Sequence, residues 1–210
     1  MKKIFQFILA LVIVGFVYVI YDQISTPIRF ENEKAHKRTQ VIERIKDIRE
    51  AQRTYKSKYH KFTGSFDTLA SFILNETLEM ERKLVDEDDS VAMAMLKKAG
   101  KKNVEKFTVA VIDTIFTPAK RTAEYVQNLR YIPGTETEFI MEAGIITTES
   151  KVVIPVVECR APYKMFLDTV TYRQEIINLI DDDVNNFNRY PGIKFGSMEA
   201  GNNEAGNWED

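Results

Sequence analysis

The most apolar stretch of the chain lies at its amino end. From Ile4 to Tyr21 the sequence contains no charged side chain. A helix of about 18 residues, at about 1.5 Å per residue, is roughly 27 Å long, close to the ~30 Å hydrocarbon core of a bilayer. Tyr18 and Tyr21 stand at its far end, where aromatic rings favour the membrane interface. The pattern predicts a transmembrane anchor over residues 1–24.

A cleaved secretory signal is the alternative interpretation of this stretch. Such signals carry an apolar region of about 7–15 residues that ends at a pair of small residues. The run here is longer, and residues 17–21 offer no small pair, so we expect an anchor that stays attached. Cations flank it on both sides and leave the positive-inside count nearly even, but large domains are translocated largely regardless of charge. We expect a single pass through a bacterial inner membrane, with the C-terminal domain in the periplasm.

A helical pattern follows the anchor. Either Thr26 caps a new helix with Pro27 in its first turn, or Pro27 kinks one continuous helix. Beyond Pro27, apolar and aromatic side chains recur at spacings of three and four, which indicates an amphipathic stalk helix over residues 25–61. We assign the stripe to partner binding; the alternative is that it faces the chain's own core. Its members are Val41, Ile45, Ile48, Gln52 and Tyr55.

The stalk is also basic. Between Arg29 and Lys61 the sequence has eleven Lys and Arg against five acidic residues. Cations next to an anchor attract anionic lipid head groups, and a solvated helix face is the alternative reading. The four nearest the anchor, predicted to lie at the membrane surface, are Arg29, Lys34, Lys37 and Arg38.

Residues 62–195 predict an α+β globular domain. Ser65 is placed to cap a short helix that ends near Leu74, and residues 75–102 are expected to form a partly mobile excursion with a helical turn or two at residues 91–96. Three strand patterns follow, and the last two are spaced as a hairpin. Gly144 suggests a bulge, and Pro155 an edge strand or bulge. The three strand patterns cover residues 106–116, 138–148 and 151–160.

The C-terminal third closes with one more helix and a tail. Residues 171–187 have helical spacing, residues 193–195 predict a last short strand, and residues 196–210 form a polar tail. The fold class expected is therefore α+β, with a long N-terminal helix, transmembrane and then stalk, packed on a small antiparallel sheet.

Composition and motifs narrow the chemistry. The net charge of −2 gives no sign of nucleic-acid binding. The sequence has no phosphate-binding, zinc-protease or nucleophile-elbow motif, so we predict no enzyme, no cofactor and no catalytic residue. Cys159 is expected in the core, and His36 and His60 are too far apart to share a metal on a straight helix.

An acidic segment near the C-terminus resembles the start of a calcium-binding loop, because Asp181 and Asp183 stand at alternate positions. Asn186 and Gly192 stand where that loop needs Gly and Glu, so an EF-hand is not predicted. Two interpretations stay open, a looser calcium site and a solvated acidic helix end.

The segment Ile45–Leu69 resembles the packed half of the long helix in type IV pilins and type II secretion pseudopilins. The resemblance rests on the stripe, on Ala51 and Tyr59, and on the turn Phe62–Phe66. It implies a hydrophobic N-terminal helix, a stalk, an aromatic turn and an antiparallel sheet. Phe5, Gln6 and Phe7 stand where pilins carry a processing site and a glutamate, which favours a pilin-like protein that stays in the membrane.

These features lead to two expectations of function. The first is a structural component of a secretion or pilus-type envelope machine, acting through protein–protein contacts. Its expected partners are membrane lipid, other envelope-assembly proteins and, as one option, further copies of this chain. The alternative is a membrane-anchored periplasmic ligand-binding or sensory module, with a pocket between the sheet and the helix of residues 171–187.

Overall fold

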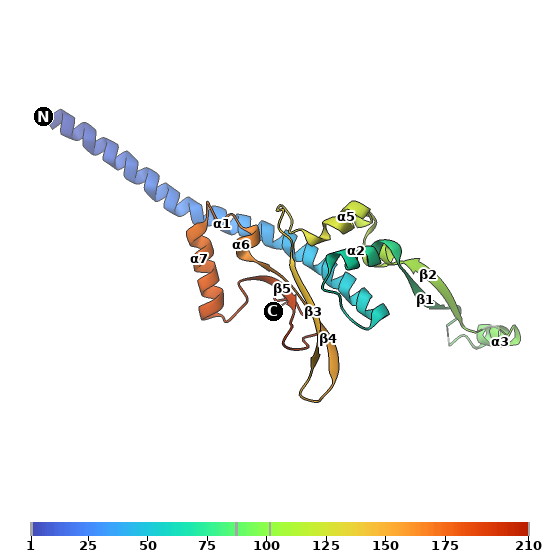
Figure 1. Cartoon of the computed structure of the whole chain (residues 1–210). Helices are drawn as coiled ribbons and strands as arrows, with labels where there is room; N and C mark the ends of the chain where they lie inside the picture. Colours follow the sequence, from blue (N-terminus) through green and yellow to red (C-terminus); the bar gives the residue numbers. More distant parts are fainter. Residues whose placement is uncertain (1, 87, 101, 210) are drawn as a thin grey trace.

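One long helix organises the molecule. The computed structural model describes residues 2–86, 88–100 and 102–209. Helix α1 (Lys2–Tyr59) runs unbroken through Pro27, so the continuous helix is the correct alternative. It ends where the backbone of His60 turns left-handed (φ 54°) and donates its N–H to Lys56 O at 2.8 Å. The N-terminal part of α1 stands free of the body, and its C-terminal part crosses the body (Figure 1).

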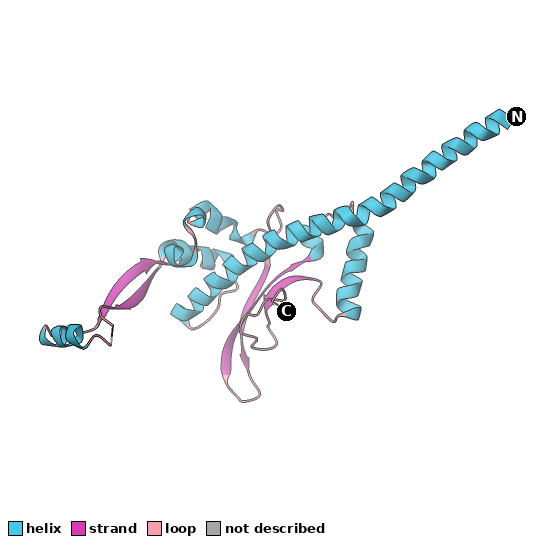
Figure 2. Cartoon of the chain, turned by 180° about the vertical axis from the view of Figure 1, so that it is seen from behind, coloured by secondary structure: helices cyan, strands magenta, loops and turns pink. Residues whose placement is uncertain are grey.

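The body combines a small sheet with short helices around α1, which confirms the α+β fold class. Strands β3 (Ile140–Thr147), β4 (Val153–Pro162) and β5 (Gly192–Gly196) form an antiparallel sheet in the order β3-β4-β5. Seen from behind, this sheet and α1 lie against one another while the free part of α1 extends away (Figure 2). The predicted hairpin and last short strand are confirmed. The remaining body elements are α2 (Phe66–Asn75), α4 (Val111–Ile115), η1 (Pro118–Lys120), α5 (Ala123–Gln127), η2 (Asn128–Arg130), α6 (Tyr163–Phe166), α7 (Arg173–Asp181) and η3 (Asp182–Asn186).

One detail of the strands differs from the sequence-based expectation, and another agrees with it. The register of β3 on β4 is continuous from Ile140↔Arg160 to Thr147↔Val153, so Gly144 makes no bulge. Pro155 pairs with β3 but lies beyond the five residues of β4 that pair with β5. A proline is tolerated there because β4 has no strand partner on its other side at that point.

The expected strand over residues 106–116 is wrong in its second half. Strand β2 (Val104–Ala110) stops early, and the chain turns into α4. Val111 is fully buried and donates its N–H to Glu76 O at 3.0 Å, and Phe116 packs edge-on against Tyr125. A helical turn brings Val111 and Phe116 into the core, which an extended strand, whose side chains alternate between two faces, would not do.

Residues 76–110 form an arm that projects from the body. Strands β1 (Thr77–Lys83) and β2 pair in antiparallel register, and α3 (Ser90–Lys98) sits at the tip, far from the body in both views (Figures 1 and 2). Asp89 caps α3 by accepting hydrogen bonds from the N–H groups of Val91 and Ala92. The excursion predicted for this region is therefore a structured hairpin, and the predicted turns at 91–96 are helix α3.

Candidate functional site

The stripe assigned to partner binding lies inside the molecule. The exposed fractions of its five residues are between 0 and 8 %, and all but Gln52 belong to the main hydrophobic core. The assignment of Val41, Ile45, Ile48, Gln52 and Tyr55 to a partner surface is therefore corrected. The stripe faces the chain's own sheet and helices, because these cover it with apolar side chains of similar size. Tyr55 shows this directly, stacking edge-on with Phe72 of α2 at 5.1 Å between ring centroids.

Gln52 has a structural task at the base of the body. Its amide Nε2 donates to Thr63 O at 2.6 Å, and its Oε1 accepts from Thr63 N–H at 3.2 Å. The Gln52 side chain thus forms two hydrogen bonds with the backbone of the turn after α1, in the way that a neighbouring strand would. The N–H and C=O groups of Thr63 each have a hydrogen-bond partner as a result. The turn leads to Ser65, whose hydroxyl caps α2 by accepting from Thr68 N–H, as the sequence predicts.

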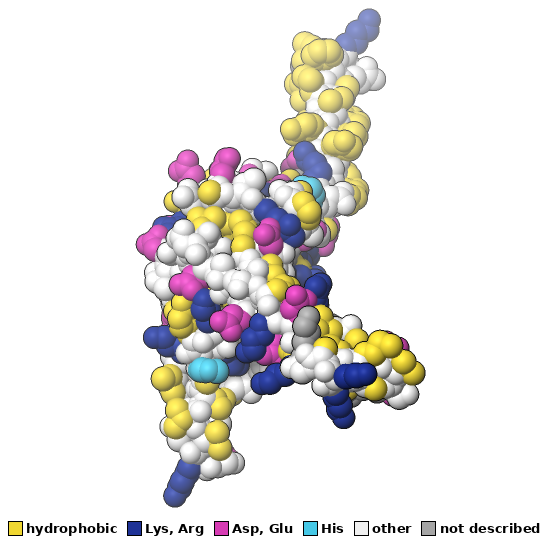
Figure 3. Space-filling model, turned by 90° about the vertical axis from the view of Figure 1, so that its right-hand side faces the viewer, with side chains coloured by type: hydrophobic (Ala, Val, Ile, Leu, Met, Phe, Trp, Pro, Cys, Tyr) yellow, Lys and Arg dark blue, Asp and Glu magenta, His cyan; other side chains and the backbone are white. Residues whose placement is uncertain are grey.

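The free part of α1 is apolar on all sides. Its large apolar side chains, from Ile4 to Ile24, are 46–71 % exposed. In the space-filling view it is a rod covered by hydrophobic side chains (Figure 3). Within the part of the chain that the structure describes, α1 is the one helix long and apolar enough to cross a membrane, near the N-terminus as an anchor or a signal sequence would be. A helix that is apolar all round, with no partner, needs an apolar medium.

Three of the four cations next to the predicted anchor have acidic partners within α1. Arg29 lies 3.6 Å from Asp22, Lys34 2.6 Å from Glu31 and Lys37 2.9 Å from Glu33. Each pair sets an acidic side chain beside the cation, so the local positive potential at these three positions is weaker than that of an unpaired cation. Arg38, the fourth predicted residue, lies close enough to Tyr163 for its charge to oppose the rise in the pKa of Tyr163 that burial and Asp183 cause. Whether these four meet lipid stays a prediction.

The polar tail predicted over residues 196–210 is docked on the body. We call residues 197–209 the C-terminal strap. Its backbone continues the edge of β5, with Gly196 N–H donating to Ala205 O and Asn207 N–H to Lys194 O, both at 3.0 Å. At the start of the strap, Gly196 has φ +76°, and a Cβ there would lie 1.9 Å from Val157 O, so only glycine fits this turn.

Acidic residues fasten the strap to α1. Glu204, whose side chain is nearly buried, lies 3.1 Å from Lys56 and 3.3 Å from Arg53. Glu209 lies 2.7 Å from Arg49, whose guanidinium also stacks over the Trp208 ring at 5.3 Å. A hydrogen bond from Gly206 N–H and the neighbouring Arg49 hold the pKa of Glu209 below its usual value. Part of the basic stretch of the stalk is thus bound to the strap.

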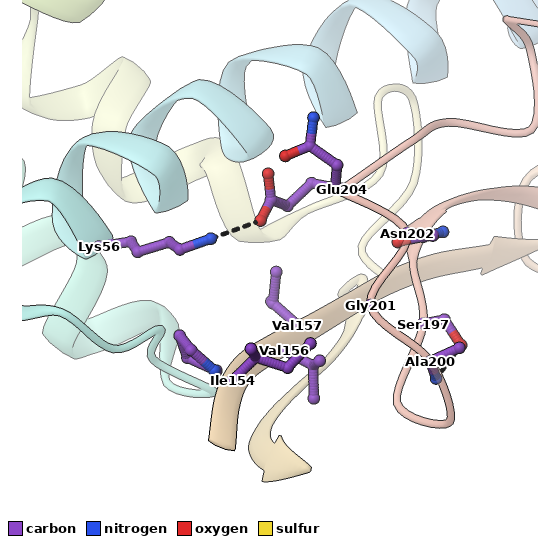
Figure 4. Close-up of a pocket in the computed structure, with 11 residues that line it drawn as sticks. Lys56, Ile154, Val156, Val157, Ser197, Ala200, Gly201, Asn202 and Glu204 are labelled. Atoms are coloured by element: carbon purple, nitrogen blue, oxygen red, sulfur yellow. Dashed lines mark hydrogen bonds and ion pairs between the residues drawn. The ribbon is translucent and has the colours of Figure 1, made fainter. Parts of the chain in front are cut away.

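A hollow opens between the strap and β4. It encloses about 280 Å³ and is lined by Val156 and Val157 on one side and by Ser197, Asn202 and Glu204 on the other. Figure 4 shows Lys56 and Glu204 joined across its rim by an ion pair. Because these two charges neutralise each other, the hollow offers a ligand mainly apolar walls and neutral polar groups.

The sequence has one thiol and one acidic segment that were candidates for chemistry. Cys159 is fully buried and burial raises the pKa of its thiol, which keeps it protonated and inert, so the core position is confirmed. The described ranges contain no group of three or more His, Cys, Asp or Glu that could hold a metal ion. In the acidic segment, Asn185 donates to Asp181 at 2.6 Å, and Asp183 hydrogen-bonds Tyr163 and helps raise its pKa.

Comparison with known proteins adds no relative. No protein-family model matches the sequence, and neither the search of curated proteins nor the search of solved structures found a match. The functional argument therefore depends on the geometry of this chain alone.

Proposed function

We propose that this chain is a single-pass, pilin-like structural component of a cell-envelope assembly, such as secretion or pilus-type machinery. Residues 1–24 would hold it in a bacterial inner membrane, with its body on the periplasmic side. The observation that carries the proposal is α1 itself, which passes without a break from a bare apolar rod to a helix with one face buried in the body. An unbroken helix fixes the body at a set distance from the bilayer, as a scaffold requires.

Three features support the pilin-like form of this proposal. A long N-terminal helix packs its C-terminal half on an antiparallel sheet, and an aromatic turn at Phe62 leads to a second helix. The anchor lacks an acidic residue before Asp22, so a role in the membrane suits this chain better than assembly into a filament.

Membrane attachment is tested first. The full chain should sediment with membranes, resist carbonate extraction, and have the intact mass of a polypeptide that begins before Ile4. Changing Leu11 and Val14 together to Arg should move the protein out of the membrane fraction, since each Arg at the centre of a span costs about 2.5–3.5 kcal/mol. Changing the exposed Ile145 and Val153 to Arg is the matched control and should leave fractionation unchanged. A soluble protein that begins beyond Tyr21 would overturn the proposal.

Orientation and partners need a second experiment. A Ser150→Cys variant places an exposed thiol in the turn between β3 and β4, whereas the native Cys159 is buried. A membrane-impermeant maleimide should label this variant in spheroplasts if the body is periplasmic. Crosslinking in intact cells followed by mass spectrometry should then recover envelope proteins; recovery of cytoplasmic proteins alone would contradict the proposal.

The hollow beneath the strap is the observation that favours the alternative, a membrane-anchored ligand-binding or sensory module. It lies between the strap and β4, whereas the pocket expected from the sequence would lie between the sheet and the helix of residues 171–187. This site would accept a small, largely neutral molecule, because its two charged groups are already paired. A small molecule that raises the melting temperature of the wild-type chain, but not of an Ala200→Trp variant that adds a bulky ring to the lining of the hollow, would support this alternative.

A further inference from the structure

We propose that the tip of the arm is a self-association site, where α3 of one copy pairs antiparallel with α3 of a second copy. The first observation is an exposed apolar stripe on this helix. Val91 and Met95 are 63 % and 67 % exposed, and Ala94 lies exposed between them. With Lys98, these positions follow the spacing i, i+3, i+4 and i+7 of a helix–helix contact surface. The small Ala94 at the centre lets two backbones approach closely.

The second observation is the distribution of charge along the tip. Positions 86–89 are four consecutive acidic residues before the helix, and Lys97 and Lys98 lie in its last turn. Asp86, Asp88 and these lysines are exposed, and among the described residues none of these lysines forms an ion pair. One end of the tip is therefore negative and the other positive.

This arrangement is complementary to itself in one orientation. When two copies pair antiparallel about a two-fold axis, the acidic end of each meets the basic end of the other, and the two apolar stripes face each other. The antiparallel helix dipoles add to the attraction. A parallel pair would place like charges together, so the charge pattern selects the antiparallel pair.

A second copy fits the tip better than a lipid surface does. The tip lies at the opposite end of the molecule from the anchor (Figure 1), and its acidic end would be repelled by anionic head groups. Viewed from the arm's end, hydrophobic and basic side chains crowd together on the projecting tip (Figure 3). The ribbon behind the tip extends the apolar surface, since Met80 and Phe107 pair across β1 and β2 and both remain exposed.

The contact between the two helices is small, so its strength depends on the local concentration of the chain. A helix of nine residues buries less than the roughly 1,200 Å² of a stable interface, so the pair is weak in dilute solution. Anchoring both copies in one bilayer raises their effective concentration and favours the pair. In this respect alone the inference rests on the proposed membrane anchor; the pairing geometry does not depend on it.

Site-specific crosslinking of the full chain, in detergent and in reconstituted vesicles, tests the pair. A Met95→Cys variant puts one accessible thiol at the centre of the stripe, and a short bis-maleimide should join two copies. Ser150→Cys, at an exposed turn on the body, is the matched control and should give little dimer. The dimer yield should also fall as salt rises, because the charges at the tip are exposed to solvent.

Charge reversal decides whether the partner is a second copy in the antiparallel orientation. Lys97→Glu with Lys98→Glu, or Asp86→Lys with Asp88→Lys, should each reduce the Met95→Cys dimer yield by roughly tenfold, since like charges then meet. Mixing the two variants should restore the dimer, because each end again meets its opposite. Both variants should keep the wild-type melting temperature, since neither change touches the core.

Several results would overturn the inference. They are a Met95→Cys dimer no stronger than that of Ser150→Cys, a dimer insensitive to both charge reversals, a mixture that fails to restore it, or crosslinking in cells only to a different protein. Loss of the dimer with membrane attachment intact would refute the tip contact and leave the proposed function standing. Failure of membrane attachment would refute the proposed function and leave the detergent measurement of the tip decisive.

Discussion

Replacing Gln52 by Met tests whether the polar member of the buried stripe is structural. Gln52 is fully buried, and its amide makes both hydrogen bonds to the backbone of Thr63. Methionine has nearly the same length and volume but neither donates nor accepts strongly. The change therefore removes both hydrogen bonds to Thr63, and the weaker one from the amide to Met141 Sδ at 3.1 Å, without opening a cavity.

The expected loss of stability follows from the two backbone groups of Thr63 that the substitution leaves without a hydrogen bond. Thr63 N–H and C=O stay buried, since Thr63 is among the buried polar residues. An unsatisfied buried backbone group costs about 1–3 kcal/mol, so two together should cost about 2–4 kcal/mol after partial relaxation. For a folded region of this size, 1 kcal/mol shifts the melting temperature by about 2–4 °C. We expect Gln52→Met to melt roughly 4–16 °C below the wild type.

Thermal unfolding of the full chain in detergent measures this shift. Trp208, the one tryptophan in the sequence, packs against the core and reports on the body through its fluorescence. Gln40→Met on the exposed side of the same helix, where Gln40 contacts only the ring of His36, is the matched control and should change stability by less than about 0.5 kcal/mol. A Gln52→Met variant that melts within about 2 °C of the wild type would refute the structural role of Gln52.

Three further predictions follow from burial and charge. Ile48→Asp puts a carboxylate in a fully buried, apolar site and should prevent folding, whereas Ile145→Asp on a 68 % exposed side chain should be tolerated; protease resistance distinguishes them. Glu204→Gln leaves two cations of α1 without their counter-charge and should lower stability by about 1–2 kcal/mol and change Trp208 emission; unchanged emission would contradict the strap contact. Burial and a neighbouring carboxylate raise the pKa of Tyr163 to about 12 from 10.0, so its stabilising effect is complete below pH 10 and is lost as the pH rises through 12. Tyr163→Phe should flatten that alkaline loss in pH-dependent melting, and an unchanged slope would show that other groups cause it.

Elements with strong local signals could be predicted from the sequence. The stripe from Val41 to Tyr55 follows the helical period, and Ser65 supplies the capping hydroxyl that starts α2. The β3–β4 hairpin alternates well enough to be placed within two residues. These signals depend on neighbours along the chain, so they survive without knowledge of the tertiary structure.

What a stripe packs against is set by residues distant in sequence. Apolar residues at helical spacing are expected both on a surface that binds a partner and on a face that packs in the chain's own core. In this chain the stripe is buried because β5 and the short helices pack against α1. Local alternation likewise extended β2 to Phe116, because Val111 and Phe116 are apolar in either conformation. Tertiary packing, which no window of sequence contains, overrode the pattern.

The strap was missed for a related reason, and it changes how the charges of the stalk are understood. Residues 197–209 are polar and rich in glycine and asparagine, which reads as a solvated tail. Their acidic side chains form ion pairs with Arg49, Arg53 and Lys56, which lie about 150 positions earlier in the chain. A count of charged residues in the stalk includes these three cations as if they were unpaired. Three of the four cations near the predicted anchor are paired within their own helix. Many cations of the stalk are therefore ion-paired within the molecule. The lysines of the arm tip are exposed to solvent, and this contrast is why we place the electrostatic contact with another molecule at α3.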